Sequence, residues 1–330
     1  MVAIFTDFSR ASRHVPLFFQ AGEAVIRPTL ETCLTLRRHH RLGRFALLYL
    51  LLSAPPLETT PAAADEPAPD KSGYSLFNPT PTDQMRSFNT DRPTKANVPW
   101  TIDAGHYQVE SDLAFYTYDH DNAAHVTQRS WSVPDPIFKA GLTDRVQLDL
   151  LFSGLYNHTS LKNRDTGTTR TFEGFGDVSL RTKVNLWGNE GGETAFAVMP
   201  YVKLPTDTGH IGSSQVEGGM QAPLAVSAPL DVTVIVMPSF DALKNVNNSG
   251  THAHFSQLIN ANRSIVPDVT GYVEFYADES AAGGTATFYT LDFGLAWQFA
   301  PDWQIDGGTY IGLNRAAPDL QTYIGIAHRF

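Results

Sequence analysis

The sequence predicts an all-β protein: a transmembrane antiparallel up-and-down β-barrel of about twelve strands. Three observations predict it. Apolar and polar residues alternate through most of the chain after residue 105, the alternating segments run for about 10–14 residues, and short turns alternate with longer polar loops. No segment in this region shows the 3.6-residue period of an amphipathic helix, which excludes a βαβ architecture.

The alternation gives each predicted strand one apolar and one polar face. In the stretch RVQLDLLFSGLYN, which begins at Arg145, Val146 and Leu148 share a face opposite Gln147 and Asp149. The same pattern predicts strands near residues 106–118, 129–141, 145–157, 175–187, 193–204, 216–228, 231–241, 251–264, 270–279, 286–299, 303–313 and 320–330.

The connections between these strands are of two kinds. Tight turns such as LTDRV and VPDVT alternate with longer polar stretches such as residues 158–175 and 245–251. Aspartate suits a tight turn because its side chain can bond nearby backbone groups. It directly precedes the next strand at Asp144, Asp231, Asp268 and Asp302. Short turns on one side and long loops on the other are typical of periplasmic turns and outer loops.

Strand length favours a membrane barrel over a secreted soluble β-sandwich, the alternative all-β architecture. Sandwich strands usually have about 5–6 residues, whereas a tilted strand needs about 9–11 to cross a bilayer. A closed barrel also removes the unpaired sheet edges that lipid cannot satisfy. Residues 105–330 are therefore predicted to form a barrel in the bacterial outer membrane, with the apolar faces against membrane lipids.

The N-terminal part of the chain contains a predicted signal peptide at residues 37–64. Arginines precede the apolar run FALLYLLL at 45–52, and Ala62 and Ala64 fit a small-x-small cleavage site. The alternative, a buried helix, is disfavoured because the proline-rich sequence that follows cannot continue a helix. Residues 1–36 are predicted to be an upstream extension from a translation start placed too early, with a long n-region as the alternative.

Residues 65–104 are rich in proline and show no sustained period, which predicts an extended segment on the periplasmic side. The 330-residue chain has a net charge of −10, and its single cysteine, Cys33, lies in the predicted upstream extension, before the predicted cleavage site. Disulfides and cysteine-based metal sites are therefore excluded from the mature part, and nucleic acid is not an expected partner of so acidic a chain. No cofactor is predicted.

Charged residues on the polar faces are the candidate lumen-lining set. They are Glu110, Asp112, Asp149, Asp177, Arg181, Lys183, Lys203, Glu217, Glu274, Asp292 and Asp306. Charges that line a pore can tune the passage of a solute. The alternative is a structural role, in ion-pair networks that fill a narrow barrel. A barrel of about twelve strands is intermediate in width between eight-stranded barrels, whose interior is filled by side chains, and sixteen-stranded barrels, whose interior is an open channel.

The sequence supports neither a metal site nor a catalytic nucleophile. His252 and His254 have a spacing that can hold a metal, but no third ligand has a defined spacing to them. Ser256 lies near His254, but the pair is not a recognisable nucleophile motif, and the stretch GSSQ at 212–215 lacks the Gly-x-Ser-x-Gly elbow. No metal site, catalytic residue or enzymatic activity is predicted.

Aromatic residues near the predicted strand ends are candidates for the girdles at the two membrane interfaces. They are Trp100, Trp131, Trp187, Trp297, Trp303, Tyr107 and Phe299. Stacking against a ligand is the alternative role for each of them.

The last residues resemble the C-terminal signal of outer-membrane barrels, Gly-x-x-aromatic-x-aromatic, which the barrel assembly machinery recognises. Gly325 and Phe330 match that pattern, and His328 stands where an aromatic residue is usual. The resemblance implies that the last predicted strand closes the barrel and that the assembly machinery is a partner.

The chain also resembles a bacterial family of outer-membrane transporters described as "MetA-pathway of phenol degradation". The resemblance is carried by TDRPTKANVPWTIDAGHYQVE (90–110), GDVSLRTKVNLWG (176–188), AVMPYVKLPT (197–206), VEGGMQAPLAV (216–226), GYVEFYADES (271–280) and GTYIGLNRAAPDLQTYIGIAHRF (308–330). It implies a transporter or channel for small solutes, aromatic compounds among them, and carries over no catalytic residue. The alternative is a structural or surface-binding barrel without transport.

Overall fold

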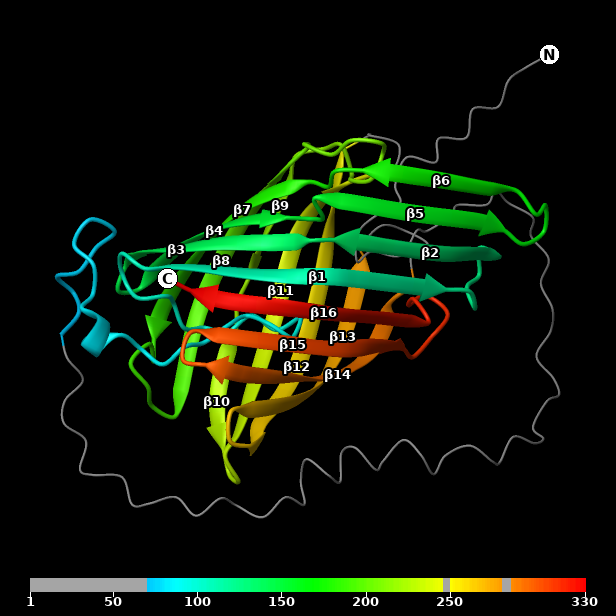
Figure 1. The fold of residues 1–330 in the computed structure, drawn as a ribbon. Helices are drawn as coiled ribbons and strands as arrows, with labels where there is room; N and C mark the ends of the chain where they lie inside the picture. The colour runs from blue at the N-terminus through cyan, green and yellow to red at the C-terminus, as the bar shows by residue number, and fades with distance from the viewer. Residues whose placement is uncertain (1–69, 246–249, 281–285) are drawn as a thin grey trace.

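The computed structural model describes residues 70–245, 250–280 and 286–330. They form one antiparallel sheet that closes on itself, because the last strand, β16, pairs with the first, β1 (Figure 1). The prediction of a closed antiparallel barrel is confirmed. The predicted extension at 1–36 and the predicted signal peptide at 37–64, with Ala62 and Ala64, lie outside the described residues.

Sixteen strand elements make up the twelve strands of the barrel. They are β1 (Tyr107–Asp119), β2 (Val126–Val133), β3 (Asp135–Thr143), β4 (Val146–Phe152), β5 (Tyr156–Asn163), β6 (Thr169–Gly174), β7 (Val178–Trp187), β8 (Thr194–Leu204), β9 (Glu217–Gln221), β10 (Leu224–Ala228), β11 (Val232–Lys244), β12 (Thr251–Val266), β13 (Val269–Ser280), β14 (Phe288–Ala300), β15 (Trp303–Gly312) and β16 (Leu320–Arg329). One 3₁₀ turn, η1 (Thr82–Gln84), precedes them.

Four barrel strands are each interrupted once, between β2 and β3, β4 and β5, β6 and β7, and β9 and β10. Three of these breaks lie side by side. The backbone N–H of Leu155 donates to Pro134 at 2.8 Å, and that of Gly176 donates to Gly154 at 3.0 Å. Proline has no N–H to give to a ladder, and Gly154 has a positive φ of 84°. These three neighbouring strands are therefore all interrupted at the same height of the barrel wall.

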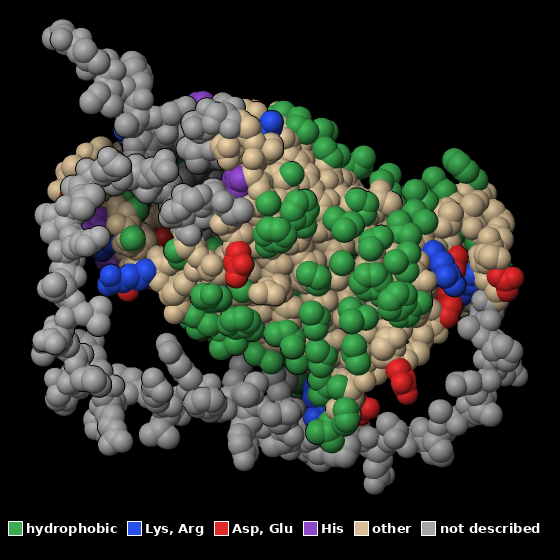
Figure 2. Space-filling view, turned by 180° about the vertical axis from the view of Figure 1, so that it is seen from behind, with side chains coloured by type: hydrophobic (Ala, Val, Ile, Leu, Met, Phe, Trp, Pro, Cys, Tyr) green, Lys and Arg blue, Asp and Glu red, His purple; other side chains and the backbone are tan. Residues whose placement is uncertain are grey.

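The outer face of the wall is apolar, as the alternation predicts. Ile259, Phe275 and Leu295 expose 49%, 40% and 52% of their surface, although they lie in the middle of β12, β13 and β14. Figure 2 shows hydrophobic side chains spread over the wall, with most of the visible charged side chains toward its two ends. A surface of this kind matches lipid, and a closed antiparallel barrel that carries it is the architecture of bacterial outer-membrane proteins.

No helix among the described residues is long and apolar enough to cross a membrane. Most of the predicted girdle aromatics are exposed on the outer face. Trp187, Trp297 and Trp303 lie at the end of the barrel where the tight turns are, together with Tyr107 and Phe299, and Trp131 lies on β2. The girdle prediction is wrong for Trp100, which lies inside the barrel and packs against its inner wall.

Residues 86–103, which we call the lumen segment, lie inside the barrel. Residues 70–85, which precede them, lie at the end of the barrel that also holds the C-terminus (blue to cyan in Figure 1). The side chains of the lumen segment bond inner-wall residues of β1, β3, β7, β14 and β15. The predicted periplasmic location of the proline-rich segment is therefore wrong for these residues. The charged residues of the lumen segment pair with residues far away in the sequence, and a local sequence pattern cannot reveal such pairs.

Candidate functional site

The structure places all eleven predicted lumen residues on the inner side of the wall. Ten of them are buried, and Asp112 keeps 19% of its side chain exposed. They fall into three groups. Two groups bond the lumen segment, and the third pairs Lys203 with Asp177 at 3.1 Å and Glu217 at 2.5 Å.

Asp91 is the centre of the first group. Its carboxylate lies 2.6 Å from Lys139 Nζ, 2.8 Å from Lys183 Nζ and 3.2 Å from the guanidinium of Arg181. Burial alone would raise the pKa of the Asp91 carboxyl, but the three cations outweigh burial and hold this pKa well below its usual value. One carboxylate of the lumen segment thus bonds three buried cations of β3 and β7.

The wall supplies two further carboxylates to this group. Glu110 pairs with Lys139 and accepts the backbone N–H of Asp91, and Asp149 accepts from Arg181 Nε at 2.9 Å. All of these side chains are at least nine-tenths buried. Buried charges are tolerated only when they are paired and hydrogen-bonded, so the charges of this group depend on one another.

The second group reverses the signs. Here the lumen segment supplies the cations: Arg92 lies 2.6 Å from Asp306 and 2.8 Å from Asp112, and Lys95 lies 2.5 Å from Asp292. Burial lowers the pKa of the Lys95 ammonium, an effect that the carboxylate of Asp292 opposes. The lumen segment thus gives a carboxylate to the group with three wall cations, on β3 and β7, and gives cations to the group of wall carboxylates on β1, β14 and β15.

A tyrosine bridge crosses the inner wall beside Arg92. The hydroxyls of Tyr272 and Tyr323 lie 2.6 Å apart, and Tyr323 donates to the Pro93 carbonyl at 2.6 Å. The bridge passes over Gly294 and Gly308, where a Cβ atom would meet the tyrosine side chains. Glycine at these two positions therefore leaves the room that lets the wall reach the backbone of the lumen segment.

An apolar stripe on the inner wall receives the rest of the lumen segment. Ala96 is fully buried among side chains of β8, β10, β11 and β12, and Val98 and Trp100 pack beside it. The wall residues of the stripe are Ala195, Ala225, Ile235, Met237 and Leu258. Trp100 Nε1 donates to the Gly188 carbonyl at 3.0 Å. The sequence did not predict this stripe, because apolar residues there occupy both faces of the strands.

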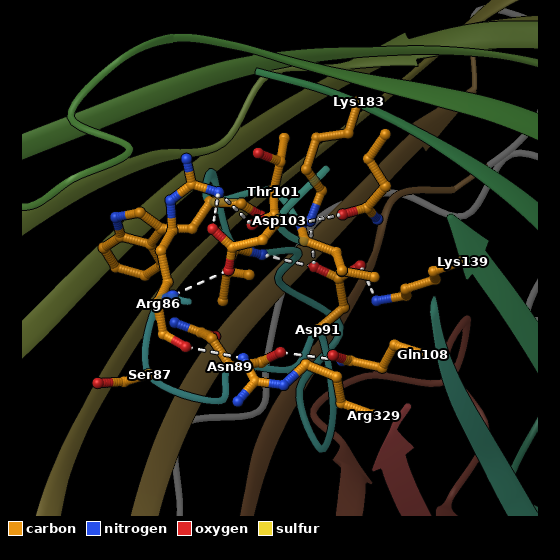
Figure 3. Close-up of a pocket in the computed structure, with 14 residues that line it drawn as sticks. Arg86, Ser87, Asn89, Asp91, Thr101, Asp103, Gln108, Lys139, Lys183 and Arg329 are labelled. Atoms are coloured by element: carbon orange, nitrogen blue, oxygen red, sulfur yellow. Dashed lines mark hydrogen bonds and ion pairs between the residues drawn. The ribbon is translucent and has the colours of Figure 1, made fainter. Parts of the chain in front are cut away.

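A small pocket remains between the lumen segment and the wall (Figure 3). Its labelled residues include Arg86, which faces Asp103, and Lys139 and Lys183, which point toward Asp91. The pocket has a volume of about 20 Å³ and is lined in part by Arg329. A cavity of this size holds about one water molecule, so it is too small for an aromatic solute.

His254 does not lie in a metal or catalytic arrangement. Its Nδ1 lies 3.1 Å from Asp241 and its Nε2 lies 2.6 Å from Asp278, so neither ring nitrogen is available to take a proton from Ser256. His252 bonds Asn245 instead of sharing a site with His254. Over the part of the chain that the structure describes, no three metal-ligating side chains are grouped to hold an ion.

The C-terminal residues close the barrel. β16 pairs with β1, and the backbone N–H of Phe330 donates to the Tyr107 carbonyl at 2.8 Å. The His328 ring stacks on Trp303 with centroids 3.7 Å apart and meets the Phe330 ring edge-on at 4.3 Å. Gly325 lies under the Arg92 guanidinium, where a Cβ atom would collide with it. Histidine thus fills an aromatic position, and glycine leaves room for the lumen segment.

Several of the residues that hold the lumen segment were not predicted. Lys139 lies on the inner face of a predicted strand, which is a signal that could have identified it. Asp91, Arg92 and Lys95 lie in the sequence TDRPTK, whose dense charge was the only local sign that this stretch differs from an ordinary linker.

Similar proteins include several outer-membrane barrels of known structure. The COG4313 outer membrane channel from Pseudomonas putida F1 is 13% identical over 68% of this chain and 95% of its own, with a TM-score of 0.49. The translocator domain of the autotransporter NalP from Neisseria meningitidis is 10% identical over 68% of this chain and 88% of its own, with a TM-score of 0.42. The NanC porin is 10% identical over 67% of this chain and 98% of its own, with a TM-score of 0.41.

No curated protein matches the chain. The model of one protein family matches residues 90–330, which includes the whole barrel and most of the lumen segment. The chain therefore belongs to the family described as "Putative MetA-pathway of phenol degradation".

Proposed function

We propose that the protein is an outer-membrane channel for small solutes, aromatic compounds among them, and that the lumen segment closes the channel until it moves. The observation that carries this proposal is that the interior is filled by a separate segment and not by the side chains of the wall alone. Residues 86–103 belong to no strand, so their departure would leave every strand pairing of the wall intact.

The composition of the inner wall supports aromatic solutes. Trp100, an aromatic side chain, packs against the apolar stripe. When the lumen segment leaves, this stripe would face the lumen opposite a charged wall, and apolar surface next to convergent polar groups suits a small aromatic molecule. The family description, which refers to phenol degradation, points to the same class of solute.

A structural barrel without transport is the second candidate. The specific observation in its favour is that Asp91, Arg92 and Lys95 are all ion-paired deep in the wall, which would also suit a permanent plug. The two candidates differ only in whether the lumen segment moves.

Uptake of benzenesulfonate into proteoliposomes tests the channel. This aromatic anion stays ionised at neutral pH and has no neutral form that crosses lipid, so we expect faster uptake with the purified protein than with empty liposomes, and faster still with the Asp91→Ala variant. If neither protein carries benzenesulfonate above the lipid background, the channel is not supported and the structural barrel is the better interpretation.

We also propose that the last strand is the part that the barrel assembly machinery recognises. Deletion of Phe330 removes a backbone hydrogen bond to Tyr107 and an aromatic contact with His328, and we expect it to lower the amount of folded protein in the outer membrane several-fold. His328→Phe keeps a ring beside Trp303 and should assemble at least as well as the wild type. Heat-modifiable mobility on gels measures both; equal assembly of the deletion variant and the wild type would refute the role of Phe330.

A further inference from the structure

We propose that Asp292, Glu274, Tyr276 and Tyr310 form a binding site for a small organic ammonium ion, and that Lys95 occupies this site while the lumen segment is in place. The inference deepens the proposed channel, since a solute can reach the site only when the segment moves. All four residues belong to β13, β14 and β15, so the site remains in the wall after Lys95 has left.

The surroundings of the Lys95 ammonium match those of a bound organic cation. Its Nζ lies 2.5 Å from Asp292 Oδ2 and donates to Thr290 Oγ1 at 2.9 Å. The same nitrogen lies 3.8 Å from the centroid of the Tyr310 ring and 4.9 Å from that of Tyr276. An ammonium group over the face of an aromatic ring is attracted by the ring quadrupole, and the attraction strengthens when water is excluded. Tyr310 is 7% exposed, so this site is largely dry.

Two buried carboxyl groups of the wall, Asp292 and Glu274, lie next to Lys95. The Asp292 side chain is fully buried, yet its Oδ1 has no hydrogen-bond partner. Glu274 is also buried and accepts the backbone N–H groups of Lys95 and Ala96 and the amide of Asn260. A buried carboxylate oxygen without a donor is costly, because it has lost its water and gained nothing in exchange. The unpaired oxygen therefore offers a place for a further donor of a bound ammonium.

The donor set selects an organic ammonium ion over a metal ion. Two carboxylates could attract either, but the faces of Tyr276 and Tyr310 cannot serve as ligands to a hard metal ion, whereas they suit an alkylammonium group. Phe288 packs against Tyr276 with centroids 5.7 Å apart, so an aromatic ring attached to the ammonium would meet further rings. The ligand class is therefore a primary alkylammonium, with arylalkylammonium ions as its aromatic members.

Occupation of the site by a solute would compete with Lys95. The lumen segment would then lose the bonds of Lys95 to Asp292 and Thr290, and would keep the two backbone bonds to Glu274 as its hydrogen bonds to β13. A cationic solute would thus favour the open lumen, because it binds a surface that the closed state covers.

Chemical complementation tests the site without measuring transport. Lys95→Ala removes atoms equivalent to n-propylammonium, and we use that ion as the probe. If its dissociation constant is on the order of 10 mM, 100 mM of probe should raise the unfolding midpoint of the variant in detergent by about 2–4 °C. The midpoint is read from heat-modifiable gel mobility. The wild type and Lys95→Met, whose side chains fill the site, should show no shift.

Two controls identify the groups involved. n-Propanol, which has nearly the same shape but no charge, should not stabilise Lys95→Ala, and Lys95→Ala/Asp292→Asn should lose the response to n-propylammonium. If Lys95→Ala does not refold alone, the refolding yield with n-propylammonium against n-propanol is the readout. The proposed site is overturned if n-propylammonium does not stabilise Lys95→Ala, or if n-propanol or an equal concentration of a sodium salt stabilises this variant as much. Benzenesulfonate uptake is independent of this result, so a failed channel and a failed ammonium site are distinguishable.

Discussion

Replacing Asp91 by alanine is expected to release the lumen segment and to raise the conductance of the barrel in planar bilayers. The substitution leaves Lys139, Arg181 and Lys183 buried with one carboxylate fewer, and removing one partner of a buried ion pair typically costs about 3–5 kcal/mol. Repulsion among the three cations then opposes the closed state, and opening the lumen to water relieves it. We expect frequent openings in the variant and rare ones in the wild type.

Asp83→Ala is the matched control for this prediction. Asp83 is an exposed aspartate in η1, outside the lumen segment, and its loss should leave both conductance and stability near the wild-type values. Asp91→Asn removes the charge but keeps an acceptor oxygen, so its conductance should lie between those of the wild type and Asp91→Ala. A fully folded Asp91→Ala protein with wild-type conductance would show that this carboxylate does not hold the segment closed.

Arginine in place of Ile259 is expected to prevent stable insertion into the outer membrane. Ile259 lies in the middle of β12 on the outer face and is 49% exposed. An arginine on the lipid face near the bilayer midplane costs about 2–4 kcal/mol, which is a large part of the stability of an ordinary domain. Folded protein in the outer-membrane fraction, measured by heat-modifiable mobility, should fall several-fold.

Thr251→Arg is the control on the same strand. Thr251 is exposed at the beginning of β12, far from the middle of the wall, where an arginine costs about 0–1 kcal/mol. This variant should therefore insert normally. Equal insertion of the two variants would mean that the exposed apolar face of β12 does not contact lipid.

The wall of the barrel could be predicted from the sequence because each strand is defined by the pattern of residues that are neighbours in the sequence. Alternation such as that around Gln147 and Asp149 shows directly which side chains share a face, and both residues are buried in the structure. The strand interruptions at Gly154 and Gly176 were not predicted, because the alternation of apolar and polar residues resumes after only a few irregular residues. The inner apolar stripe was missed because Ile235 and its neighbours on β11 are apolar on both faces.

The lumen segment could not be placed from the sequence for a different reason. It has no regular backbone hydrogen bonding of its own, so it shows no period that a pattern could detect. Its position depends on contacts over long separations, such as that of Asp91 with Lys183, 92 residues away, and that of Lys95 with Asp292, 197 residues away. Charge complementarity between such distant residues becomes visible only when the strands are assembled.

Single-channel conductance with a reversible cross-link tests most directly whether the lumen segment closes the channel. Asn97 of the segment donates to Gln221 of β9 at 2.9 Å, so cysteines at these two positions can be joined by a short disulfide-forming cross-linker in the Asp91→Ala protein, with Cys33 replaced by serine. We expect the cross-linked protein to be silent and the reduced protein to open. Equal conductance before and after reduction would contradict a role of this segment as the gate.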